Sequence, residues 1–293
     1  MEKLQIFENF SRDGKREFLS LNDVEERCPV AFASEATHPT CSDRYVPLRT
    51  ADVIDLVSTF GWHPVSARQT GSGPRPARSL HMVTFEHPEL GIIDKDNPIG
   101  VPRLILINSL DGFTKLQFYC GFFRFVCSNG LIISDASFSS LKVRHAKTSM
   151  AEVAELIKNV IAKMEPSIQA VSGMANTQLT EEAATNFALG ALALRIKFKK
   201  PQGAESEKLA DYLSFGEDML APLHEADKGR NDLWYHFNNL QERMVKGRFC
   251  YLDRTTGKGH SLRKISGIAR SIEFNKDLFR LATAFSQPIM ANE

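Results

Sequence analysis

Residues 114–134 read TKLQFYCGFFRFVCSNGLIIS and form the densest apolar stretch of this chain. They follow the run RLILINS and the turn sequence that contains Asp111 and Gly112. Asp-Gly between two β-rich runs is typical of a type I′ hairpin turn, because both residues tolerate a positive φ. We therefore predict an antiparallel hairpin at the centre of the fold. Four of its side chains should be largely buried, because alternation fixes the register wherever one face is covered: Leu104, Leu106, Leu116 and Phe118.

The apolar run continues through residues 122–127, FFRFVC, as a buried strand or as a short helix. So short a run fits both interpretations. Asn129 and Gly130 end it, since both residues accept the left-handed conformation. Arg124 lies inside the run, where an unpaired charge is costly. We therefore expect Arg124 to form a structural ion pair or to contact a ligand.

The composition is that of an ordinary soluble globular protein. The chain has 293 residues, 43% hydrophobic and 24% charged, which suffices for one large domain or two small ones. No apolar run reaches the roughly 18 residues of a membrane helix. The N-terminal segment has no apolar signal core, and the five cysteines are odd in number and scattered. We therefore expect a cytoplasmic protein with reduced thiols and no membrane partner.

The order of the expected elements predicts an α+β fold, with an antiparallel β-sheet front half packed by helices and a mostly helical C-terminal half. Residues 1–43 are small and polar in part and are expected to be a weakly ordered leader. Residues 44–175 should form an α+β core with a central antiparallel sheet. Residues 176–293 should form a mostly helical region packed on that core.

Local signals predict where individual helices begin. Thr50 is expected to be the N-cap of a helix of about ten residues. Ser149 and Glu152 have the spacing of a capping box, and Asn275 is expected to cap the last helix. Residues 248–267, RFCYLDRTTGKGHSLRKISG, are interpreted as a loop.

The sequence contains no recognisable catalytic motif. Residues 257–261, GKGHS, lack the earlier Gly of a phosphate-binding loop, and Cys120 and Cys127 are wrongly spaced for a zinc module. We therefore predict no catalytic residues, no metal and no cofactor. An enzyme whose site combines distant residues such as Cys127, Asn129 and His145 stays an alternative.

Basic residues gather in the C-terminal part of the chain. Residues 246–280 contain nine Lys and Arg against three Asp and Glu, so this segment carries +6 while the whole chain carries +1. Two smaller basic clusters lie elsewhere: Lys142, Arg144, His145 and Lys147 in one, and Arg68, Arg75 and Arg78 in the other. Aromatic residues lie near the three clusters: Phe138, Tyr251 and Trp62. Basic side chains beside aromatic rings are what a sequence-tolerant single-strand binder needs. The other interpretation is a solvated basic surface.

Several phrases of the sequence resemble one known family. They are SDRYVPLRTADVIDLVSTFGW, SLHMVTF, LILINSLDGFTKLQFYCGFFRFVCSNGLI, KVRH and NDLWYHFNNLQERMVKG. They resemble the phage/plasmid-like family catalogued as domain of unknown function 932, over residues 42–285. The resemblance implies a bacterial or phage cytoplasmic protein carried by mobile elements, and it supplies no catalytic residues.

We therefore expect a non-enzymatic protein of a mobile element that binds nucleic acid, preferably single-stranded, in replication, recombination or transfer. The residues expected to bind nucleic acid are Arg124, Arg144, His145, Arg263 and Lys264. The alternative is a protein-binding factor that acts on a host defence or regulatory system. The sequence leaves open the choice between DNA and RNA, and it is compatible with an oligomer.

Overall fold

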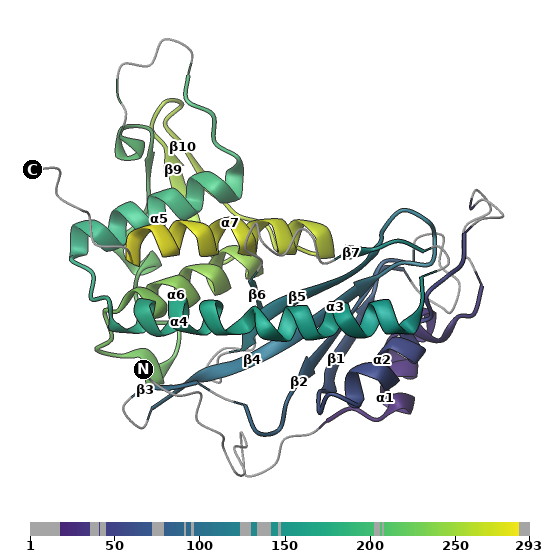
Figure 1. The fold of residues 1–293 in the computed structure, drawn as a ribbon. Coiled ribbons are helices and arrows are strands. Elements are labelled where there is room, and N and C mark those ends of the chain that lie inside the picture. The colour runs from purple at the N-terminus through teal and green to yellow at the C-terminus, as the bar shows by residue number, and fades with distance from the viewer. Residues whose placement is uncertain are drawn as a thin grey trace, which may run out of the picture. The chain divides into compact units, whose positions relative to one another are not determined.

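The structure is a computed structural model that describes most of the chain (Figure 1). It describes residues 18–35, 41, 45–71, 79–90, 92–94, 97–123, 130–133, 142–145, 148–201, 206 and 208–286. Contacts divide the chain into two compact units. Unit 1 comprises Met1–Phe125 and Gly130–Ile168, and unit 2 comprises Val126–Asn129 and Gln169–Glu293.

Unit 1 is built on a seven-stranded antiparallel sheet. Its main strands are β1 (His63–Gln69), β2 (His81–Glu86), β4 (Asn97–Asn108), β5 (Leu116–Phe123) and β6 (Gly130–Ile133), adjacent in this order. Two short strands complete it: β3 (Ile92–Asp94) pairs with β4, and β7 (Lys142–Val143) pairs with β5. Together with the helices described below, the sheet confirms the predicted α+β class.

The hairpin formed by β4 and β5 is the core of unit 1, as predicted. Leu104 pairs with Cys120 and Leu106 with Phe118, and the four side chains expected in the core are fully buried. The expected type I′ turn is wrong, because only Gly112 has a positive φ, of 79°. The connection between the strands is longer than two residues. The Asp111 carboxylate shapes it by accepting hydrogen bonds from the backbone N–H of Ser79 and of Phe113.

The strand β5 ends at Phe123, so the first two residues of the FFRFVC run are extended. Arg124, Cys127 and Asn129 lie outside the described residues.

Helices pack against this sheet within unit 1. They are α1 (Leu21–Arg27), the 3-10 helix η1 (Pro29–Phe32), α2 (Thr50–Ser58) and α3 (Met150–Ala162). α3 lies across one face of the sheet (Figure 1), and the capping box of Ser149 and Glu152 begins it, as predicted. α1 and η1 fall inside the expected leader, and Val24 and Val30 are fully buried there.

Thr50 is the first residue of α2 rather than its N-cap, which is Arg49. Its hydroxyl lies 2.7 Å from His81 Nε2 and accepts a hydrogen bond from Asn108 Nδ2 at 2.9 Å. The prediction was wrong because the side chain binds residues distant in sequence instead of its own helix.

The helix α4 (Met164–Asn176) follows α3 after a break at Lys163, and Pro166 lies in its first turn, where a missing N–H is tolerated. Within the described residues, no helix combines the length and apolar character needed to cross a membrane.

The described residues of unit 2 form three long helices and a small sheet. The helices are α5 (Glu181–Ile196), α6 (Leu233–Lys246) and α7 (Ile268–Ser286), and the antiparallel strands are β8 (Leu213–Ser214), β9 (Cys250–Asp253) and β10 (Lys258–Ser261). Between α5 and α6, residues 208–232 include the 3-10 helices η3 (Leu209–Asp211), η4 (Glu217–Met219) and η5 (Glu225–Asp227). α6 is central, because every residue from Leu233 to Met244 is buried.

Two predictions for unit 2 were wrong. Residues 248–267 are not all loop, because β9 and β10 form a hairpin within them. Asn275 does not cap the last helix, which already begins at Ile268. Asn275 is buried inside α7, where its Oδ1 accepts a hydrogen bond from Gln241 Nε2 of α6 at 2.9 Å.

Candidate nucleic-acid interface

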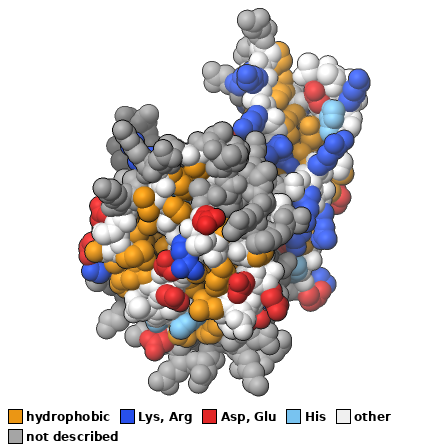
Figure 2. All heavy atoms as spheres, turned by 90° about the vertical axis from the view of Figure 1, so that its right-hand side faces the viewer, with side chains coloured by type: hydrophobic (Ala, Val, Ile, Leu, Met, Phe, Trp, Pro, Cys, Tyr) orange, Lys and Arg blue, Asp and Glu red, His pale blue; other side chains and the backbone are white. Residues whose placement is uncertain are grey.

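The residues between α6 and the second turn of α7 form a strongly basic surface, here called the basic segment (residues 248–270). It contains six Lys and Arg side chains, all exposed: Arg248, Arg254, Lys258, Arg263, Lys264 and Arg270. None of the six forms an ion pair with a carboxylate of residues 208–286. Figure 2 shows Lys and Arg side chains gathered on the upper part of one face, at the height of the β9–β10 hairpin in Figure 1.

The one carboxylate of the basic segment, Asp253, has a local structural role. Its Oδ1 accepts hydrogen bonds from the backbone N–H of Thr255 at 2.9 Å and of Thr256 at 3.3 Å, which shapes the turn between β9 and β10. Desolvation alone would raise the pKa of Asp253, but these hydrogen bonds outweigh it and the pKa is lowered. Asp253 is therefore ionised at neutral pH, and six cations oppose this single negative charge.

The β9–β10 hairpin brings two rings together. Tyr251 and His260 are directly opposite in the antiparallel pair, and their rings stack with centroids 5.1 Å apart at an angle of 22°. His260 is exposed and Tyr251 is half-buried. Burial, followed by the nearby charge of Asp253, raises the pKa of the Tyr251 hydroxyl, which is therefore protonated at neutral pH.

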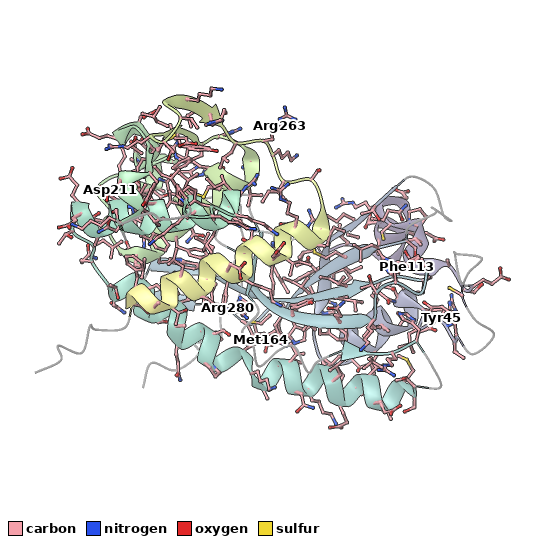
Figure 3. All side chains as sticks on the ribbon, turned by 90° about the horizontal axis from the view of Figure 1, so that it is seen from above. Tyr45, Phe113, Met164, Asp211, Arg263 and Arg280 are labelled. Carbon is pink, nitrogen blue, oxygen red and sulfur yellow. The ribbon has the colours of Figure 1, made fainter. Side chains whose placement is uncertain are left out.

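Hydrogen bonds to α5 and α6 hold the backbone around Arg263 and Lys264 in place. The Arg263 carbonyl accepts a hydrogen bond from an Arg195 Nη at 2.6 Å, and Arg195 is buried in α5. On the other side, the Ile265 N–H donates to the Val245 carbonyl at 2.8 Å. The two basic side chains therefore project into solvent from a held backbone, on the stretch between β10 and α7 where Figure 3 labels Arg263.

Gly247, which ends α6, makes this close approach to the basic segment possible. Its φ is 73°, and a Cβ at this position would lie 2.5 Å from the Lys264 nitrogen and 2.8 Å from the Arg263 carbonyl carbon. Only glycine combines this backbone conformation with that contact. The end of α6 is thus packed directly against the residues expected to bind nucleic acid.

The other residues expected at the interface belong to unit 1. Arg144 is exposed just after β7. His145 is buried, where its Nδ1 accepts a hydrogen bond from the Leu48 N–H at 3.0 Å and its ring stacks on Tyr45. Burial lowers the pKa of His145 to about 4, so the imidazole is neutral at pH 7 and adds no positive charge beside Arg144. Arg124 lies outside the described residues.

The structure therefore places Arg263 and Lys264 together in unit 2 and describes Arg144 and His145 within unit 1. A single groove that joins the two clusters stays a prediction. The Tyr251–His260 pair was missed as part of the site, because residues 248–267 were interpreted as a loop. The available signal was the turn sequence that ends in Gly257, which has a φ of 66° and lies between two short runs of equal length.

The buried polar side chains of α6 form hydrogen bonds with residues 221–224, which precede the helix, and do not line an exposed binding site. Glu242 is buried and accepts hydrogen bonds from His224 Nε2 and from Lys246 Nζ, each at 2.7 Å. Burial alone would raise the pKa of Glu242, but these partners outweigh it and the pKa is lowered. Arg243 donates to the Ala221 carbonyl at 2.8 Å. Within the described residues, no three His, Cys, Asp or Glu side chains are grouped so that they could hold a metal ion.

The fold defines an α+β protein with a helical unit that carries an exposed basic segment. The chain belongs to the family described as Domain of unknown function (DUF932), whose model matches residues 37–284. The resemblance inferred from the sequence is thereby confirmed. Two similar proteins of Escherichia coli (strain K12) are UPF0380 protein YafZ, 29% identical over 258 residues, and UPF0380 protein YfjQ, 28% identical over 256 residues. The alignments cover 87% of this chain in both cases, with 87% of YafZ and 86% of YfjQ. No solved structure matches.

Proposed function

We propose that this protein binds nucleic acid without enzymatic action on it, prefers single strands, and serves the replication, recombination or transfer of a mobile element. The observation that supports the proposal is the basic segment, with six exposed cations, one carboxylate already used in a turn, and a backbone held by α5 and α6. Cations on a fixed backbone bind phosphates with little ordering of the chain.

Phosphate binding has a quantitative signature, because cations that neutralise phosphates release the counterions condensed on the strand. Each neutralised phosphate of a single strand contributes about −0.7 to the slope of log affinity against log salt concentration. Six contacts therefore predict a slope of about −4, which is a loss of affinity of about 300-fold between about 50 and about 200 mM salt.

Fluorescence anisotropy with a labelled single strand of about 30 nucleotides, and with the corresponding duplex, tests the proposal at about 50 mM salt. The double substitution Arg263→Glu with Lys264→Glu should weaken binding at least tenfold, because it replaces two attractive charges with two repulsive ones. Melting curves should show that the fold is kept, since both side chains are exposed.

A matched control reverses two exposed cations of unit 2 that lie outside the basic segment. Lys228 and Arg280 pair with Glu225 and Asp277, so Lys228→Glu with Arg280→Glu makes the same change in net charge elsewhere. The control should retain most of the affinity. Equal losses in both double variants, or no binding of either probe at micromolar protein, would overturn the proposal in favour of a protein-binding factor.

A further inference from the structure

The β9–β10 hairpin is exposed on both of its faces. All four residues of β10 are exposed, and β9 alternates between exposed and half-buried residues. The third strand, β8, contributes only two residues. The hairpin is therefore held along β9 by β8, while β10 lies at the free edge of this sheet with its side chains in solvent.

The hairpin carries ring surfaces between cations. The Tyr251–His260 pair lies at its middle, with centroids 5.1 Å apart. Arg248 precedes β9, Arg254 lies in the turn and Arg263 follows β10, and all three are exposed. Rings therefore alternate with phosphate-binding groups along one continuous piece of chain.

We propose that the β9–β10 hairpin is the element that stacks on unpaired bases, with His260 and Tyr251 as the stacking surface. The inference rests on the proposed function and adds the reason why the site prefers single strands. Every base has a π face, so stacking on an aromatic side chain tolerates any sequence. In a duplex these faces are occupied by neighbouring base pairs, and only the phosphates remain for the cations.

A two-stranded ribbon can also enter the major groove of a duplex and read base edges. The middle of this hairpin does not suit that role, because one face carries Cys250, Leu252 and Gly259 and the other carries the stacked rings. The forked Arg and amide side chains that read base edges are missing from the middle of both described strands.

Three labelled probes test the inference: an oligothymidine strand of about 30 nucleotides, an abasic strand of the same length and charge, and a duplex of that length. The wild-type protein should bind oligothymidine about tenfold more tightly than the abasic strand, as expected for one stacked base. His260→Ala and Tyr251→Ala should remove this preference while the affinity for the abasic strand stays unchanged.

Two further variants control for the fold of the hairpin. His260→Phe keeps a ring and should keep the preference. Leu252→Ala removes an exposed side chain from the opposite face and should also leave the preference unchanged.

Equal binding of oligothymidine and the abasic strand by the wild type would overturn the inference while the proposed function stands. Tighter binding of the duplex than of either single strand would overturn it as well, in favour of groove insertion. Failure to bind any of the three probes would overturn the proposed function and this inference together.

Discussion

Replacing Gly247 by Ala tests the packing that holds the basic segment against α6. An L-residue in the left-handed conformation of Gly247, with φ of 73°, costs about 1–2 kcal/mol. The added Cβ would also lie 2.5 Å from the Lys264 nitrogen and 2.9 Å from the Leu262 carbonyl oxygen. These contacts are with backbone, so relief requires the segment to move, and overpacking of this kind adds about 1–3 kcal/mol. Gly247→Ala should therefore lower the free energy of unfolding by about 2–5 kcal/mol.

Gly229 supplies the matched control. Its φ is 78°, and a Cβ there would meet nothing within 4 Å, so Gly229→Ala carries the conformational penalty alone. Urea unfolding followed by circular dichroism gives both free energies, and Gly247→Ala should be the more destabilised of the two. Gly247→Ala should also weaken single-strand binding, because it displaces the backbone of Arg263 and Lys264. Equal destabilisation in the two variants would refute the close packing of the basic segment on α6.

Two predictions concern unit 1. Phe118→Ala should lower the free energy of unfolding by about 3–5 kcal/mol, because the side chain is fully buried in the central hairpin. Urea titrations measure this change, and a loss below about 1 kcal/mol would contradict the buried position of Phe118. Burial lowers the pKa of His81 to about 4 and that of His145 to about 4, below the unfolded value of about 6.5. Their contribution to stability is therefore complete above pH 6.5 and is lost as the pH falls towards 4, by up to about 3 kcal/mol for the fully buried His81. Urea titrations at several pH values should show this loss, and stability independent of pH over this range would contradict it.

Local signals predicted much of the fold because they act within a few residues. The capping box at Ser149 and the alternation around Phe118 depend on neighbours in sequence, and the structure confirms both. The N-caps predicted at Thr50 and Asn275 were wrong, because both residue types are common at N-caps but these two side chains form hydrogen bonds with residues distant in the sequence. Asn275 accepts from Gln241, which lies 34 residues away on another helix, and no local pattern reveals such a contact.

The sequence was sufficient to predict the basic residues of the candidate interface but not the hairpin that carries several of them. A count of charges identified the basic residues near Arg263 before the structure was known. The β9–β10 hairpin was not predicted, because both of its faces are exposed and alternation of apolar with polar residues is therefore missing. For the same reason the ring pair of Tyr251 and His260 became visible only when the register of the two strands was known.

The salt dependence of single-strand affinity tests the central claim most directly. For the wild type, log affinity against log salt concentration should be a straight line with a slope of about −4, as six phosphate contacts require. The double variant Arg263→Glu with Lys264→Glu should reduce the slope to about −3, because two contacts are lost. A wild-type slope near zero, or the same slope in both proteins, would contradict the assignment of the basic segment as a nucleic-acid interface.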